Sequence, residues 1–134
     1  PSGLAKLAEA YGAQDQPEEG LYVLAEALEI VDATDMGFYE AELYRLKGTL
    51  QLQLHAGQHT GEAEASFRRA LDIARHQHAK SWELRAATSL ARLWQQQDKR
   101  QDATDLLAPV YNWFTEGFDT ADLIDAKALL EELT

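Results

Sequence analysis

The chain has 134 residues, of which 46% are apolar, and it contains no cysteine. This length suits one domain with a single core, and the lack of cysteine excludes disulfides and thiolate metal sites and predicts a cytoplasmic protein. A net charge of −11, from 12 basic and 23 acidic residues, argues against nucleic acid as a partner. A membrane span is not expected, because the sequence has no run of about 20 apolar residues. Because the chain starts at Pro1 with neither an initiator Met nor a signal pattern, we expect a piece of a longer protein.

Seven helices are predicted in chain order, because Leu and Ala dominate the apolar residues and Pro is rare. Pro17 suits the first turn of the second helix, and Asp119 with Thr120 suits the start of the last one. Pro109 lies inside the sixth helix, where the loss of a backbone hydrogen bond predicts a bend. The helices are expected near residues 3–14, 18–34, 37–56, 61–78, 80–97, 100–115 and 120–133.

One spacing of large and small residues occurs three times along the chain. In an antiparallel helix pair, small residues are needed where the two helices approach closely, and large residues fill the core. Seven positions of the first copy recur 83 residues later in the third: Leu4 with Ala87, Leu7 with Leu90, Ala8 with Ala91, Tyr11 with Trp94, Gly20 with Ala103, Leu24 with Leu107 and Ala27 with Val110. A looser middle copy contains Tyr44, Gly48, Ala63, Phe67 and Ala70.

This spacing resembles the tetratricopeptide repeat, whose first helix carries large, small and aromatic residues and whose second carries Ala or Gly, a large residue and Ala. The copies begin about 40 to 43 residues apart, against about 34 in the standard repeat. That longer spacing resembles the extended repeats that follow the nucleotide-binding domains of bacterial signalling ATPases. Residues 40–134 resemble the end of bacterial proteins that join a cyclase or a DNA-binding domain to a predicted ATPase, most specifically at Ala79 to Leu133.

The resemblance implies an all-α fold, a right-handed superhelical stack of antiparallel helix pairs. We expect one domain, with repeats at 1–36, 37–79 and 80–117 and a capping helix at 118–134. The N-terminal end, from Leu4, has no such cap, so either another repeat or a second copy, giving a homodimer, is expected there. The capping helix has Leu123, Ala126, Leu129, Leu130 and Leu133 on one side and Asp122, Asp125, Glu131 and Glu132 on the other.

The resemblance also implies a groove, because the first helix of each tetratricopeptide pair lines the inner face of the stack. Three arginines in it could bind a carboxylate or an extended acidic peptide through bidentate, charge-assisted hydrogen bonds. The alternative is that these arginines pair with neighbouring acids such as Glu42 on a solvated face. The Asn residues of the family's carboxylate clamp are missing. The predicted groove residues are Arg45, Thr49, Gln53, Arg85, Thr88, Arg92, Gln95 and Gln96.

No metal site is expected from the histidines or the aspartates. His55 and His59 have i, i+4 spacing, but Gly57 predicts that the helix ends between them. Aspartates 119, 122 and 125 could be imagined as a cation site, yet acids in the first turns of a helix are favoured by its dipole. These acids are therefore interpreted as helix-start residues.

The aromatic residues are interpreted as structural. Trp94 occupies the aromatic position of the repeat, and no role is assigned to Trp82. Aromatic residues beside a proline kink and a cap are more often core than a ligand cradle. The four residues interpreted as core in this way are Tyr111, Trp113, Phe114 and Phe118.

A non-enzymatic scaffold or protein–protein interaction module of a larger bacterial signalling protein is the expected function. The partner is expected to be another protein or other domains of the parent; the alternative is an effector sensor that binds a small molecule or an acidic peptide in the groove. No catalytic residue and no cofactor are expected, since no GxxxxGK[ST] loop is present. Net charges of −9 in residues 1–42, +5 in 43–100 and −7 in 101–134 indicate solvated faces, a basic groove, or pairing between copies.

Overall fold

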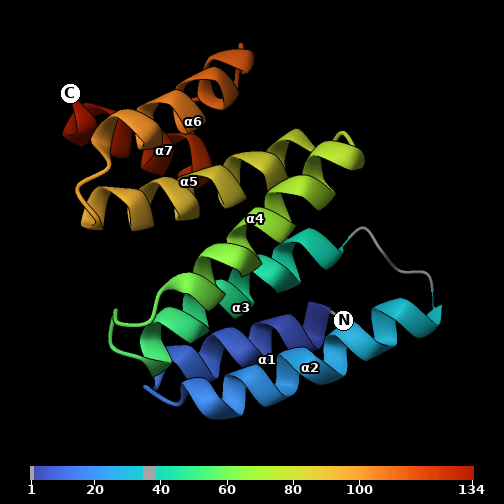
Figure 1. Cartoon of the computed structure of the whole chain (residues 1–134). Coiled ribbons are helices and arrows are strands. Elements are labelled where there is room, and N and C mark those ends of the chain that lie inside the picture. Colours follow the sequence, from blue (N-terminus) through green and yellow to red (C-terminus); the bar gives the residue numbers. More distant parts are fainter. Residues whose placement is uncertain (1, 35–38) are drawn as a thin grey trace.

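The computed structural model describes residues 2–34 and 39–134, without the side chains of Ser2 and residues 32–34. Within these ranges the chain forms seven helices and no strand (Figure 1), as the sequence predicts. Every helix end lies within three residues of its predicted position, although residues 37 and 38, expected in the third helix, lie outside the described residues. None of the described helices combines the length and apolarity needed to cross a bilayer. The helices are α1 (Ser2–Ala13), α2 (Pro17–Thr34), α3 (Glu40–Leu54), α4 (Gly61–His76), α5 (Lys80–Gln96), α6 (Arg100–Trp113) and α7 (Ala121–Leu133).

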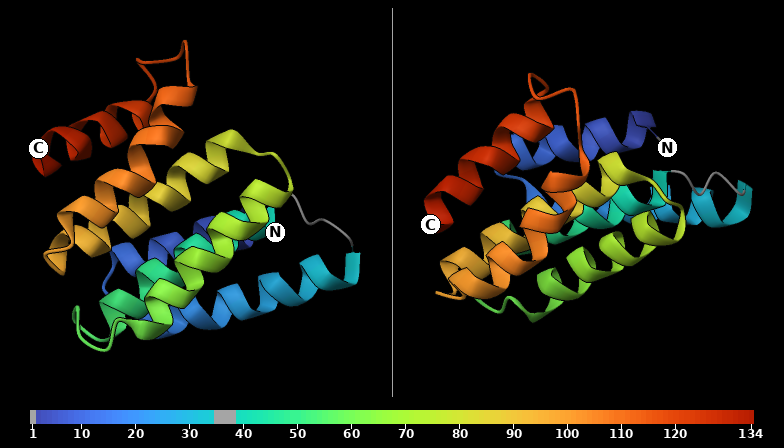
Figure 2. Two further views of the ribbon diagram at one scale, coloured as in Figure 1. Left: turned by 45° about the horizontal axis from the view of Figure 1, so that its top comes forward. Right: turned by 90° about the horizontal axis from the view of Figure 1, so that it is seen from above.

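Consecutive helices form antiparallel pairs, α1 with α2, α3 with α4 and α5 with α6, and α7 packs on the last pair (Figures 1 and 2). The odd-numbered helices also contact one another in the order α1, α3, α5, α7. Each even-numbered helix packs on the odd-numbered helix before it and on the one after it. Side chains about one repeat apart in the sequence therefore become neighbours on the side that the odd-numbered helices share.

Two glycines permit the close helix approach that the repeat spacing predicts. A Cβ atom on Gly48 would lie 2.6 Å from Cε1 of Phe67, and one on Gly20 would lie 3.0 Å from the carbonyl oxygen of Ala8 and 2.8 Å from Leu50. Phe67 is 1% exposed, so its ring is enclosed by a close-packed core. Both positions therefore favour a small residue, and a Cβ atom at Gly48 would meet a buried ring, which agrees with the small-residue interpretation.

Helix α7 packs on both α5 and α6. Leu123, Ala126, Leu129 and Leu133 are buried in one cluster with residues of α5 and α6, and Leu130 packs against it. The opposite end of the molecule is more open.

At that N-terminal end, large apolar side chains reach the surface. Leu7 is 44% exposed and Tyr22 is 71% exposed. Leu90 stands at the position of the third copy that corresponds to Leu7. It is 1% exposed and packs with Ala63 and Phe67 of the preceding helix. The homodimer through this face stays a prediction.

The aromatic residues that follow Pro109 divide into two groups. Helix α6 continues through Pro109 to its last residue, and Tyr111 and Phe114 pack against the core of the α5–α7 region. Trp113 and Phe118 are 57% and 47% exposed, so the prediction that all four belong to the core is wrong for these two. Trp113 lies off the buried stripe of α6, and Phe118 lies in the loop beyond the helix.

Two tryptophans take structural positions. Trp82, to which the sequence assigned no role, is half-buried, with its ring 6.4 Å from that of Tyr39 and 5.7 Å from the guanidinium carbon of Arg85. Trp94 packs against two parts of the core, and its indole N–H donates to Glu64 at 3.1 Å. The structural interpretation of Trp94 is confirmed.

Candidate binding cleft on the odd-numbered helices

A cleft on the side shared by the odd-numbered helices brings together most of the predicted groove residues. It has a volume of about 330 Å³ and is lined by α3, α5 and α7. Guanidinium, hydroxyl and carboxylate groups meet there, and we call it the arginine cleft. Its lining residues are Arg45, Thr49, Arg85, Thr88, Ser89, Arg92, Asp122 and Asp125.

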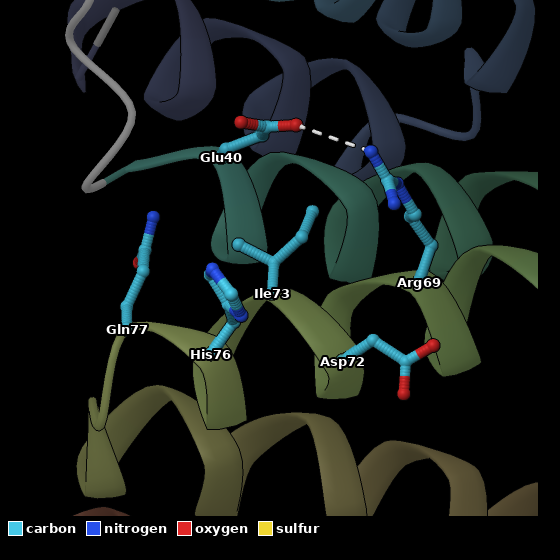
Figure 3. A pocket seen from close by; sticks show the side chains of 6 residues that line it. All are labelled: Glu40, Arg69, Asp72, Ile73, His76 and Gln77. Atoms are coloured by element: carbon cyan, nitrogen blue, oxygen red, sulfur yellow. Dashed lines mark ion pairs between the residues drawn. The ribbon is translucent and has the colours of Figure 1, made fainter.

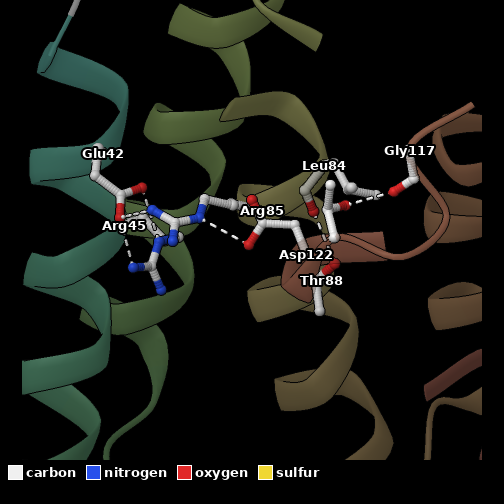
Figure 4. Close-up of polar contacts among 8 residues, drawn as sticks. Glu42, Arg45, Leu84, Arg85, Thr88, Gly117 and Asp122 are labelled. Carbon is white, nitrogen blue, oxygen red and sulfur yellow. Dashed lines mark hydrogen bonds and ion pairs between the residues drawn. The ribbon is translucent and has the colours of Figure 1, made fainter. Parts of the chain in front are cut away.

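Glu42 holds two of the three arginines in place (Figure 4). Its side chain is only 9% exposed. Arg45 donates to its carboxylate from Nε at 3.0 Å and from Nη2 at 2.6 Å, which is the bidentate arrangement that a guanidinium fork favours. Arg85 donates to the same carboxylate from Nη1 at 2.8 Å and so links α5 to α3. Glu42 is therefore a buried, fixed counter-ion for both helices.

Two aspartates of α7 complete the charge pairing. Arg85 donates from Nε to Asp122 at 3.1 Å, and Arg92 donates from Nη2 to Asp125. The side chains of Asp122 and Asp125 are 38% and 55% exposed. The alternative that the sequence left open, in which the arginines pair with nearby acids, is thus realised by all three of them.

The pairing keeps the cleft close to electrical neutrality. Burial by itself would lower the pKa of Arg85, but the carboxylates of Glu42 and Asp122 outweigh it and raise that pKa above its ordinary value. Arg85 therefore remains charged. The three guanidinium charges face the three carboxylate charges of Glu42, Asp122 and Asp125, because α7 adds two acids to a face that α3 and α5 alone would make basic.

Predicted residues outside the arginine cleft have other roles. Gln53 lies near the end of α3, where its side-chain amide donates to the carbonyl of Gly12 at 2.7 Å and to Asp15 at 3.2 Å and so ties α3 to the end of α1. Gln95 and Gln96 do not line the cleft, and Gln96 is exposed.

The two predicted threonines do line the cleft, but both hydroxyls donate within their own helix. Thr49 donates to the carbonyl of Arg45 at 3.2 Å, and Thr88 to that of Leu84 at 2.8 Å. Their hydroxyl oxygens keep the capacity to accept a hydrogen bond from a ligand.

Sequence reasoning missed three lining residues. Ser89 stands four residues after Arg85 and three before Arg92, so helical periodicity alone could have included it. Asp122 and Asp125 were placed on the polar side of the cap, but no spacing rule indicates that this side turns toward α5. Their position depends on how α7 crosses the preceding pair.

A second cavity, of about 250 Å³, extends the same face toward α1. It shares Arg85 with the arginine cleft, and Lys6 and Glu9 bring further charges of both signs to its wall. The half-buried ring of Trp82 lines it as well. The polar face thus continues across α1, α3, α5 and α7.

A third cavity, of about 400 Å³, lies between the start of α3 and the end of α4 (Figure 3). The ion pair between Arg69 and Glu40 is long at 3.9 Å, and the carboxylate of Asp72 points away from Glu40. Its polar groups do not converge on one point, in contrast to those of the arginine cleft.

The histidines do not form a metal centre. The rings of His55 and His59 stand edge-to-face with centroids 5.7 Å apart. The described part of the chain contains no group of three or more His, Cys, Asp or Glu side chains that could hold an ion.

No family model, curated protein or solved structure matches the chain. The functional interpretation therefore depends on the arginine cleft and on the repeat spacing.

Proposed function

We propose that this chain is a non-enzymatic interaction module of stacked, tetratricopeptide-like helix pairs, which holds a protein partner along the face of α1, α3, α5 and α7. It would act as a scaffold within a larger cytoplasmic signalling protein of bacteria, contacting another protein or other domains of the parent. The observation that carries the proposal is that five residues selected by repeat register line one cleft. They are Arg45, Thr49, Arg85, Thr88 and Arg92.

The chemistry of the cleft suits recognition of a polar chain. A guanidinium has five N–H donors in a fixed plane, more than the two bonds that Arg85 makes to acids. The hydroxyl oxygens of Thr49 and Thr88 and the carboxylates of α7 add acceptors on the same surface. A partner's backbone and side chains would find both donors and acceptors there.

The same groups support a role without catalysis. Nucleophilic catalysis needs a hydroxyl or thiol within hydrogen-bond reach of a base. The hydroxyls of Thr49 and Thr88 donate instead to backbone carbonyls of their own helices. The ionised groups of the cleft form ion pairs with one another.

Site-specific photo-crosslinking of the full-length parent protein in cells tests this proposal. A crosslinking amino acid at Ser89, in the cleft, is compared with one at Ala65, an exposed position of α4 on the layer of even-numbered helices. We expect adducts of one defined size from position 89 and none from position 65. Equal adduct patterns at both positions, or none at either, would contradict the proposal.

A second candidate function is the sensing of a small effector. It is favoured by the size of the cleft, about 330 Å³, and by its mixture of cationic, anionic and hydroxyl groups. A thermal-shift screen of metabolites checks it, because a ligand present at 100 times its Kd adds about 2.7 kcal/mol of stability. Arg92→Gln is the matched control: a true cleft ligand loses its shift in this variant, whereas a screen without any shift counts against sensing.

A further inference from the structure

The three carboxylates that pair with the arginines of the cleft differ in burial and in their number of hydrogen bonds. Glu42 is 9% exposed and accepts three hydrogen bonds from two arginines. Asp122 and Asp125 are 38% and 55% exposed, and each is bonded to a single arginine. Exposed ion pairs contribute little free energy, because water screens the charges and both side chains lose freedom. The two aspartates are therefore the replaceable members of the cleft.

The helix that carries these aspartates is itself firmly held. Leu123, Ala126 and Leu129 are at most 4% exposed and pack in the core shared with α5 and α6. Moving α7 away would expose this apolar surface to water. Rotating an aspartate side chain about its Cα–Cβ bond leaves these apolar residues in the core. Opening of the cleft thus needs side-chain rotation only.

We infer that Asp122 and Asp125 are exchangeable counter-ions, and that the arginine cleft takes an anionic partner segment by exchanging these carboxylates for those of the partner while α7 stays in place. The inference rests on the proposed function, since it assumes that the cleft is the partner face. The resident aspartates compete with every incoming anion. A segment that offers one acid replaces one pair only, whereas a segment with several acids replaces both.

The positions of the arginines specify the spacing of the acids. Arg85 and Arg92 are seven residues apart on α5, which is about 10.5 Å along the helix axis. In an extended chain of the polyproline II type, with three residues per turn and a rise of about 3.1 Å per residue, acids three residues apart lie on the same side, about 9 Å from each other. Arg45 on α3 supplies a third cation beside the first two. The partner that fits is an extended segment with acidic residues about three positions apart.

Fluorescence anisotropy with fluorescein-labelled hexaglutamate tests the exchange. The Asp122→Asn/Asp125→Asn variant removes both exchangeable carboxylates, and Glu131→Gln/Glu132→Gln makes the same change of charge at exposed residues of the same helix that do not line the cleft. We expect the first variant to bind about two- to thirtyfold more tightly than the wild type, which is the range for two exposed ion pairs. The second variant is expected to stay within about twofold of the wild type, because its acids lie away from the arginines and salt screens them. Adding Arg92→Gln to the first variant is expected to reverse most of the gain.

Three results would overturn the inference. An equal gain in both double variants would show that net charge, and not exchange at the cleft, controls binding. A gain that survives Arg92→Gln would place the anion elsewhere, and a failure of hexaglutamate to bind any variant would show that the cleft does not take extended acids. Circular dichroism of every variant establishes that the helices are intact. The crosslinking experiment at Ser89 does not depend on anion binding, so the proposed function can stand or fail separately.

Discussion

Gly48 offers the sharpest test of the packing that positions the cleft. A Cβ atom there would meet three atoms of the buried Phe67 ring at 2.6, 2.7 and 3.0 Å. Gly48→Ala gains about 1 kcal/mol of helix propensity, but overpacking of a filled core costs about 1–3 kcal/mol. Two of these contacts are shorter than real Cβ atoms make, and the ring that they meet is 1% exposed, so we place the cost in the upper part of that range. The net loss is then about 1–2 kcal/mol, which lowers Tm by about 3–7 °C for a domain of this size.

Thermal and urea unfolding followed by circular dichroism measure this loss. Gly61→Ala is the matched control, since nothing lies within 4 Å of a Cβ atom at Gly61, and its change should stay within about 0.5 kcal/mol. Phe67→Leu in the Gly48→Ala background should give a smaller total loss than the sum of the two single changes, because the smaller side chain makes room for the new methyl group. If Gly48→Ala is as stable as the wild type, glycine is not required for the α3–α4 approach and the reasoning is refuted.

Two further predictions concern the cap and the acid sensitivity of the fold. Leu129→Ala, at a fully buried position of α7, should lower the free energy of unfolding in urea by about 2–5 kcal/mol. Ile124→Ala, at a position 54% exposed, should lower it by less than about 1 kcal/mol. Equal losses would contradict the packing of α7 as a cap. Burial alone would raise the pKa of Glu64, but hydrogen bonds from Trp94 and Arg68 outweigh it and lower that pKa below its ordinary value of 4.5. Ionised Glu64 therefore adds stability that is fully present above pH 4.5 and is lost as the pH falls through the lowered pKa. The stability difference between the wild type and Trp94→Phe should accordingly shrink below pH 4.5 in urea titrations, and a difference that is constant with pH would rule out this coupling.

The helices could be predicted closely because their signals are local. Pro17 begins α2, Thr120 precedes α7, and the apolar spacing sets the faces between those ends. Pro109 lies inside α6, as predicted, and the helix continues through it to Trp113. A proline weakens the helix by removing one hydrogen bond, but the burial of Leu107 and Val110 on either side holds the helix together.

The same reasoning identified five of the eight residues that line the arginine cleft. Arg85 and Arg92 lie where repeat register predicts, since seven residues are close to two turns of one helix. The register also pointed to Gln95 and Gln96, which do not line the cleft. Position along a repeat indicates a side of a helix but not how far along that side a cleft extends.

The sequence by itself determined the all-helical fold, the close approaches at its glycines and the apolar side of the cap, because each depends on residues within one helix or one helix pair. Only the tertiary structure decided that Asp122 and Asp125 face the arginines of α5 and that Trp113 reaches solvent. The position of the two aspartates depends on the angle at which α7 crosses the preceding pair, and many apolar contacts set that angle together. The same crossing turns a face that two helices alone would make basic into one whose charges are paired.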